Sequence, residues 1–134
     1  MQAVQAGANA KLILVIDDDA LVLEAMGGLF RLWGYEVLTA ATERDAHARL
    51  AERRRAPDLI VCDYHLSGGA TGVEAIGRLR GALPIPAFLI TSDVAVAELA
   101  QAAASGIHVV RKPADAKILR ATLRRLLGSN GREQ

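Results

Sequence analysis

The sequence predicts an α/β domain in which five parallel strands form one sheet with helices on both of its faces. Short apolar runs of strand length alternate along the chain with segments whose apolar residues recur at helical spacing. Several of the runs are continuously apolar, which is typical of strands buried on both faces of a parallel sheet. Right-handed crossovers between such strands place the connecting helices on both faces.

The first half of the chain contains two of the expected strands and two of the expected helices. They are a strand over residues 12–16, a helix over 20–32, a strand over 35–39 and a helix that begins after Thr42 and ends in the run Arg53 to Arg55. Asp18 or Asp19 is placed to cap the first helix, and Thr42 with Asp45 forms a variant capping box for the second. The apolar face of the first helix is marked by Leu21, Ala25, Leu29 and Leu32.

The second half repeats this alternation three times. The expected elements are a strand over residues 59–62 that ends at Asp63, a helix from Thr71 to about 80, a strand over 87–90, a helix over about 94–104, a strand over 107–110 and a helix over about 115–127. Thr71 and Glu74 have the spacing of a capping box, and Gly128 ends the last helix. The side chains of that helix expected to face inward are Ile118, Leu119, Leu123, Leu126 and Leu127.

Length and composition indicate one domain with an aliphatic core. Of 134 residues, 51% are hydrophobic but only 4% are aromatic. We expect the domain to occupy residues 11–128, with a flexible lead-in over 1–10 and a disordered tail over 129–134. The net charge of +1 argues against a dedicated nucleic-acid surface. The single cysteine, Cys62, excludes an internal disulfide and predicts a reduced, buried thiol and a cytoplasmic setting. We see neither a signal peptide nor a membrane span.

Polar side chains follow the ends of four expected strands. Asp17 and Asp18 follow the first strand, Asp63 ends the third, Thr91 follows the fourth and Lys112 follows the fifth. The carboxyl ends of parallel strands lie along one rim of the sheet, which is where open α/β sheets bind ligands. We therefore expect these five side chains to form one site.

Three carboxylates in one crevice would repel one another unless a cation lies among them. Oxygen ligands without a histidine or cysteine partner favour Mg²⁺. Lys112 would add a positive charge and Thr91 a hydroxyl donor, and this combination suits a phosphoryl group. A carboxylate can serve as the oxygen nucleophile in phosphoryl transfer.

Four motifs at these positions resemble the receiver domain of two-component response regulators, over nearly the whole chain from residue 11 to about 127. Ile-Leu-Val-Ile-Asp-Asp-Asp resembles the acidic-pair motif of that family, and Leu-Ile-Val-Cys-Asp resembles its phospho-acceptor strand. Leu-Ile-Thr-Ser resembles the switch threonine or serine motif, and Arg-Lys-Pro resembles the lysine motif, with a cis peptide before Pro113. The resemblance implies a flavodoxin-like doubly wound fold with strand order 2-1-3-4-5.

The resemblance also implies roles for individual residues. Asp63 would accept a phosphoryl group from a phosphohistidine. The implied Mg²⁺ ligands are Asp18, Asp63 and the backbone carbonyl of His65, with Asp17 acting through water. Thr91 and Lys112 would hold the phosphoryl oxygens. The positions at which the family tunes dephosphorylation are occupied by His65 and Asp93.

The expected partner is a sensor histidine kinase or a histidine phosphotransfer domain, with no direct nucleic-acid contact and no membrane insertion. A homodimer through the fourth helix, fifth strand and fifth helix is a further expectation.

The sequence departs from the family pattern at Val109, where an aromatic switch residue is usual, and at Ser67, where proline is common. The loop after Asp63 resembles receivers at the C-terminus of hybrid sensor histidine kinases, so an excised domain and a stand-alone receiver both stay open.

Two other readings are possible. Asp17-x-Asp19 after an apolar strand, together with Thr91 and Lys112, also resembles haloacid-dehalogenase-like phosphatases, but that family would need Thr or Val where Leu21 stands and would leave Asp63 unexplained. The second alternative is a receiver-like module that binds partners without phosphorylation, against which the complete set of motifs argues.

Overall fold

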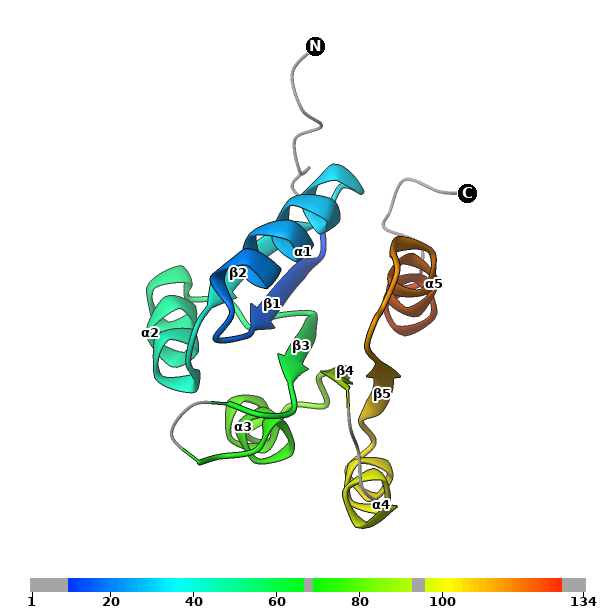
Figure 1. Ribbon diagram of the computed structural model, residues 1–134. Helices are drawn as coiled ribbons and strands as arrows, with labels where there is room; N and C mark the ends of the chain where they lie inside the picture. Colours follow the sequence, from blue (N-terminus) through cyan, green and yellow to red (C-terminus); the bar gives the residue numbers. More distant parts are fainter. Residues whose placement is uncertain (1–9, 67–68, 93–95, 129–134) are drawn as a thin grey trace.

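A computed structural model of the chain describes residues 10–66, 69–92 and 96–128, and strands and helices alternate through it (Figure 1). The strands are β1 (Leu12–Ile16), β2 (Glu36–Ala40), β3 (Leu59–Asp63), β4 (Ala87–Thr91) and β5 (His108–Arg111). The helices are α1 (Ala20–Leu32), α2 (Glu43–Arg53), α3 (Gly72–Arg80), α4 (Val96–Ala104) and α5 (Ala116–Leu127). All neighbouring strands pair in parallel, in the order β2-β1-β3-β4-β5. The predicted fold class and strand order are confirmed.

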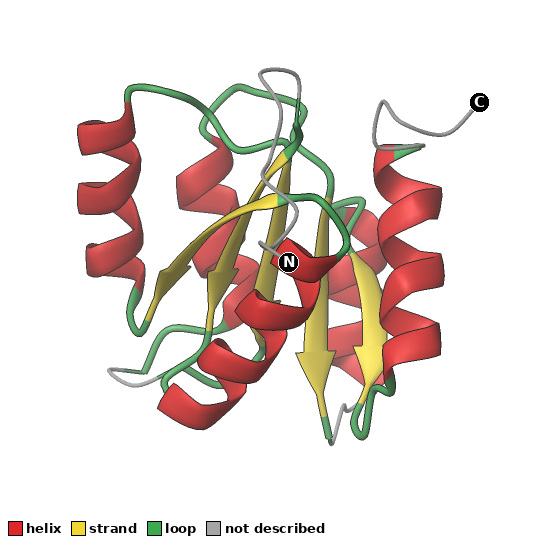
Figure 2. Cartoon of the chain, turned by 90° about the horizontal axis from the view of Figure 1, so that it is seen from above, coloured by secondary structure: helices red, strands yellow, loops and turns green. Residues whose placement is uncertain are grey.

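The sheet lies between two layers of helices (Figure 2). Alternate residues of the central strands point to opposite faces, so Ile13 and Val15 pack in the core layer that contains Phe30 of α1 and Leu123 of α5. The other faces of the same strands pack in the layer of α2, α3 and α4. Because both faces of the central strands are covered, their continuous apolar sequence is explained.

Side-chain caps fix where the helices begin. Asp19 accepts hydrogen bonds from two N–H groups of the first turn of α1, Thr42 caps α2, and Asp115 caps α5. At α3 the predicted capping box is complete, since Thr71 Oγ1 accepts from Glu74 N at 3.2 Å and Glu74 Oε1 accepts from Thr71 N at 3.0 Å. The first two caps place the start of α1 directly after the acidic run and the start of α2 directly after β2.

The predicted apolar face of the first helix was wrong for three of its four residues. Leu21 is 76% exposed and Leu32 is 65% exposed, and Ala25 also faces solvent. The buried residues of α1 are Phe30 and Gly27, and the predicted Leu29 packs against the same core layer. A Cβ at Gly27 would lie only 3.3 Å from Thr39 Cγ2 of β2. Apolar residues occur around much of this helix, so spacing alone does not select the buried side.

A similar error concerns the last helix, where Ile118 was expected to face inward but is 46% exposed. Leu119 and Leu123 of α5 are buried as predicted. The strands β2 and β5 each begin one residue later than expected, at Glu36 and His108. These shifts leave every predicted element in place.

At the end of α1 farthest from the acidic run, Trp33 lies between the two helices of its layer. The guanidinium of Arg120 of α5 sits over the Trp33 ring, 5.4 Å from its centroid, and the centroid of the Phe30 ring lies 6.0 Å from that of Trp33.

None of the helices in the described segments is both long enough and apolar enough to cross a membrane. The predicted lead-in and tail fall almost entirely outside the described residues, so the domain limits stay a prediction.

Candidate phosphoryl-transfer site

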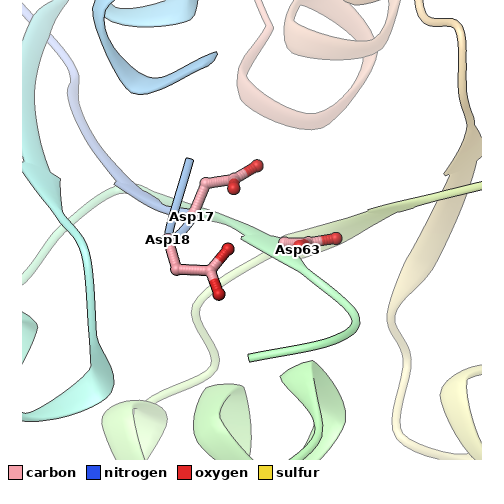
Figure 3. Close-up of side chains that lie close together, drawn as sticks. All are labelled: Asp17, Asp18 and Asp63. Carbon is pink, nitrogen blue, oxygen red and sulfur yellow. The ribbon is translucent and has the colours of Figure 1, made fainter. Parts of the chain in front are cut away.

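Three aspartates from two adjacent strands meet at the carboxyl end of the sheet. Ile16 of β1 is in register with Cys62 of β3, so the residues that follow, Asp17 and Asp63, lie side by side. Asp18 joins them, and carboxylate oxygens of the three side chains lie within 4.8 Å of one another. Figure 3 shows the three side chains lying close together. The sequence predicted this grouping.

Burial and like charge both act on Asp17, which is only 4% exposed. Burial raises the pKa of the Asp17 carboxyl above its ordinary value, the hydrogen bond from the Asp19 N–H opposes this, and the charge of Asp63 raises the pKa further. That hydrogen bond measures 2.9 Å to Asp17 Oδ1. A buried carboxylate next to two others is strained electrostatically, and a bound cation would relieve the strain.

Lys112 approaches the same cluster from β5. Its ammonium nitrogen lies 3.6 Å from Asp63 Oδ1, and its backbone N–H donates to the Thr91 carbonyl at 2.8 Å. Thr91 itself is 1% exposed at the end of β4. The peptide between Lys112 and Pro113 is cis, as the resemblance implied. The five residues expected to share one rim of the sheet therefore all occupy the carboxyl ends of β1, β3, β4 and β5.

The segment after Asp63 is held by neighbours on two sides. Tyr64 N donates to the Ile90 carbonyl at 3.2 Å, and the Tyr64 carbonyl accepts from Gly72 N at 2.7 Å. His65 is exposed and forms an isolated antiparallel bridge with Thr71, and its ring lies nearly perpendicular to the Tyr64 ring with the two centroids 4.8 Å apart. The other predicted tuning residue, Asp93, lies outside the described residues, as does Ser67.

Two other predictions about single side chains can be compared with the structure. Cys62 is fully buried, and burial raises the pKa of its thiol far above the ordinary range, which agrees with a packing role rather than a redox role. Val109 is half-buried and packs against the core layer of α2, α3 and α4.

The sequence analysis missed two residues beside the site. Tyr64 is 4% exposed, and its hydroxyl hydrogen-bonds to Glu98 of α4; burial first, and then this carboxylate, raises the tyrosine pKa. Gly72 is the first residue of α3 and comes very close to the Asp63 backbone. An aromatic residue next to Asp63 and a glycine inside a capping box were the available signals, but neither reveals its contacts from sequence alone.

The donor set fits a hard divalent cation. Its side-chain ligands are carboxylate oxygens, and no histidine or cysteine belongs to the group that the described residues bring together here. Oxygen ligands at a partly solvated rim are typical of Mg²⁺, which retains several of its own waters. The arrangement can therefore hold a divalent ion between carboxylates while Lys112 faces the same space.

Comparison with known proteins shows the family of this domain. The family model described as the response regulator receiver domain matches residues 13–124. The phosphate regulon transcriptional regulatory protein PhoB of Pseudomonas aeruginosa is 35% identical over 85 residues, which are 61% of this chain and 36% of PhoB. The transcriptional regulatory protein KdpE of Mycobacterium tuberculosis is 33% identical over 103 residues, which are 76% of this chain and 44% of KdpE. The chain thus spans between a third and a half of the length of these curated relatives.

Solved structures show the same fold. The chemotaxis protein CheY4 of Vibrio cholerae superimposes with a TM-score of 0.79 at 25% identity, covering 88% of this chain and 99% of CheY4. A CheY-like receiver domain protein of Methanospirillum hungatei reaches a TM-score of 0.80 at 22% identity, covering 93% of this chain and 99% of that one. With most of its length matched by the family model, the chain belongs to the response regulator receiver domain family and is a signalling domain of two-component systems.

Proposed function

We propose that Asp63 accepts a phosphoryl group from the phosphohistidine of a sensor histidine kinase or a histidine phosphotransfer domain. The observation that carries the proposal is the meeting of Asp17, Asp18 and Asp63 within 4.8 Å at the carboxyl rim. Lys112, at 3.6 Å from Asp63, supplies a cation on the side where phosphoryl oxygens would lie. Receiver domains as a family act together with histidine kinases.

Mg²⁺ is the cofactor that this donor set fits best. Asp18, Asp63 and the backbone carbonyl of His65 would hold it directly, and Asp17 would act through a water molecule. Bound there, the ion would neutralise charge on the phosphoryl oxygens. The raised pKa of Asp17 supports this assignment, since the carboxylate is destabilised by burial and by its acidic neighbours.

The transfer itself is a displacement at phosphorus. A carboxylate oxygen of Asp63 forms the new P–O bond, the P–N bond of the phosphohistidine breaks, and its electron pair goes to the imidazole nitrogen. Lys112 pairs with the charge on the transferred group, and the Thr91 hydroxyl donates to one of its oxygens. Hydrolysis of the acyl phosphate would later restore Asp63, at a rate to which His65 and Asp93 contribute, since they occupy the positions at which the family tunes dephosphorylation.

The outer face of α1 is suited to contact the phosphodonor. It exposes Leu21 and Leu32, with the small residues Ala25 and Gly28 between them. Leu21 lies only three positions after Asp18, so a helix packed on this face would bring its histidine near Asp63. Leu21→Glu should slow transfer from a phosphorylated donor domain but leave phosphorylation by acetyl phosphate unchanged. Leu83→Glu, which replaces an exposed leucine in the turn after α3, is the matched control and should affect neither reaction.

The phosphatase alternative is disfavoured by the position of Asp19. Its carboxylate accepts from the N–H groups of Leu21 at 3.0 Å and Val22 at 3.3 Å, so it is engaged as the cap of α1. A phosphatase of that kind would require this carboxylate at the reacting centre. Turnover of a small phosphomonoester such as p-nitrophenyl phosphate should therefore be absent.

Intact-mass analysis after incubation with acetyl phosphate tests the acceptor. We expect one phosphoryl adduct that requires Mg²⁺ and that disappears in Asp63→Ala. The control is Asp45→Ala, an exposed aspartate in the first turn of α2 that is not one of the three clustered carboxylates. An adduct that persists in Asp63→Ala would overturn the assignment of the acceptor.

The switch that follows phosphorylation should not use an aromatic rotation, because Val109 is short and stiff at χ1. Thr91 and Lys112 would still move toward the phosphoryl group, and the backbone after Thr91 would carry the change to α4. The hydrogen bond between Tyr64 and Glu98 offers a second connection from the acceptor loop to α4. Amide chemical shifts with beryllofluoride, which stands in for the phosphoryl group, should change mainly in α4 and at Lys112. Changes confined to Asp18 and the Asp63 loop would contradict this.

A further inference from the structure

We infer that Gly72 is a positioning residue for the phosphoacceptor: the absence of its side chain lets the first turn of α3 close against the backbone of Asp63. The inference rests on the proposed function of Asp63. A Cβ at position 72 would lie 2.5 Å from the Asp63 carbonyl oxygen, 2.6 Å from Leu89 Cδ2 and 3.1 Å from Tyr64 Cα. Gly72 does not belong to the glycines with positive φ, so the requirement is for space rather than for an unusual backbone conformation.

Hydrogen bonds hold the acceptor segment in this close approach. Gly72 N donates to the Tyr64 carbonyl at 2.7 Å from one side, and Tyr64 N donates to the Ile90 carbonyl at 3.2 Å from the other. The antiparallel bridge between His65 and Thr71 extends this pairing to the residues next to Tyr64 and Gly72. The backbone that carries the acceptor, and the His65 carbonyl proposed as a metal ligand, is therefore fixed between β4 and the start of α3.

An added methyl group would strain two contacts of different kinds. The Leu89 methyl is the end of a side chain and can move by a rotamer change. The Asp63 carbonyl oxygen can move only if the peptide to Tyr64 rotates or if α3 withdraws. Restoring an ordinary van der Waals distance there requires a shift of about 1 Å. Catalytic and ligand groups must be held to within about 0.5 Å, so this shift falls on the geometry of the Asp63 site.

The experiment compares Gly72→Ala with Gly77→Ala on the same helix. Gly77 is exposed, and a Cβ there would meet nothing within 4 Å, so it controls for the general effect of alanine in α3. Calorimetric titration with Mg²⁺ should show the affinity of Gly72→Ala reduced by about 10-fold to 100-fold, while Gly77→Ala binds as the original chain does. The rate of phosphorylation by acetyl phosphate should fall by at least about 10-fold for Gly72→Ala alone. Equal behaviour of the two variants would overturn the inference.

A double variant separates positioning from packing. Leu89→Ala removes the side-chain collision, so in Leu89→Ala/Gly72→Ala only the close contacts with the backbone of Asp63 and Tyr64 are left. If Gly72 acts through the backbone, the double variant still binds Mg²⁺ weakly even where its thermal stability returns to that of Leu89→Ala. Recovery of Mg²⁺ affinity to the level of Leu89→Ala would show a packing role and overturn the inference.

The original chain provides a test that does not depend on whether any variant folds. Addition of Mg²⁺ and beryllofluoride should shift the amide resonance of Gly72, which is hydrogen-bonded to the acceptor segment, and should leave that of Gly77 in place. An unmoved Gly72 resonance, in a sample where Asp63 and Asp18 respond, overturns the inference. A sample in which Asp63 and Asp18 do not respond would instead contradict the proposed function.

Discussion

Acidic side chains lie at both ends of the sheet, but their surroundings differ. At the amino end, Arg55 donates to Asp58 at 3.0 Å and to Glu36 at 3.3 Å, and Arg53 also pairs with Glu36. Asp58 accepts in addition from the backbone N–H of Leu12 at 2.7 Å. Each of these two carboxylates thus faces at least one guanidinium.

At the carboxyl end the carboxylates face one another. Carboxylate oxygens of Asp17, Asp18 and Asp63 lie within 4.8 Å of one another. The cation near them, Lys112, lies 3.6 Å from Asp63, which is longer than the contacts of Arg55 at the amino end. Arg55 also donates to the Ala10 carbonyl at 2.9 Å, so these contacts join the start of β1 to β2 and to the turn before β3. The comparison indicates that acids paired with arginines support the fold, whereas acids gathered with one another prepare a site for a cation.

The largest expected difference concerns Mg²⁺ affinity at the carboxyl end. Asp18→Ala should weaken binding by about 100-fold, because it removes a proposed direct ligand, while Asp17→Ala should weaken it by about 10-fold, because it acts through water. Calorimetric titration measures both. Equal losses would mean that the two roles are assigned wrongly.

At the amino end, Asp58→Ala should lower the free energy of unfolding by about 2 kcal/mol, since the buried N–H of Leu12 loses its acceptor. Urea denaturation gives this value. Asp58→Asn is the control, because it keeps an acceptor oxygen while losing the charge, and it should cost less. Phosphorylation of Asp63 by acetyl phosphate should be retained in both variants, and its loss would contradict the division between the two ends.

Removing a charge at the carboxyl end should raise the free energy of unfolding, whereas the Asp58 change at the amino end should lower it. Without divalent ions, Asp17→Asn should raise the free energy of unfolding by about 1 kcal/mol, because it removes one of three close like charges. Saturating Mg²⁺ should reverse the order, since the original chain binds the ion more tightly and gains more stability from it. Thermal unfolding with and without Mg²⁺ measures both effects. A destabilised Asp17→Asn without metal would contradict the proposed repulsion.

The smallest effect is expected at a paired acid on the flank of the sheet. Glu43 of α2 pairs with Arg78 of α3, whose Nε lies 2.8 Å from Glu43 Oε2. The side-chain hydrogen bonds from Arg78 lower the pKa of Glu43. A lowered folded-state pKa contributes stability that is present above the ordinary pKa of 4.5 and lost as the pH falls through the lowered value. The stability difference between the original chain and Glu43→Gln should therefore be present at neutral pH and vanish in acid. It should be small, because Arg78 is exposed and solvent screens the pair.

The rim of the sheet could be predicted from sequence because strand order and strand ends determine it. A continuous apolar run that stops at Asp63 identifies both a buried strand and the residue at its end. The side of a helix that faces the core is a weaker signal. In α1 it was decided by Gly27 and Phe30, whose fit against β2 has no periodic signature. The close approach of Gly72 to the Asp63 carbonyl could not be predicted, because it depends on the path of the loop between them, which the sequence does not specify.

The position of Trp33 decides which optical signals this domain can give. It is the sole tryptophan of the chain, and the 13 residues of α1 place it about 20 Å from the aspartates. With Arg120 of α5 over its ring, its emission reports whether the layer of α1 and α5 is intact. Tryptophan emission should therefore follow unfolding without a dye, and at this distance we expect Mg²⁺ and phosphoryl groups at the rim to leave it unchanged. Intact mass and nuclear magnetic resonance, rather than tryptophan emission, are therefore the measurements suited to follow phosphorylation.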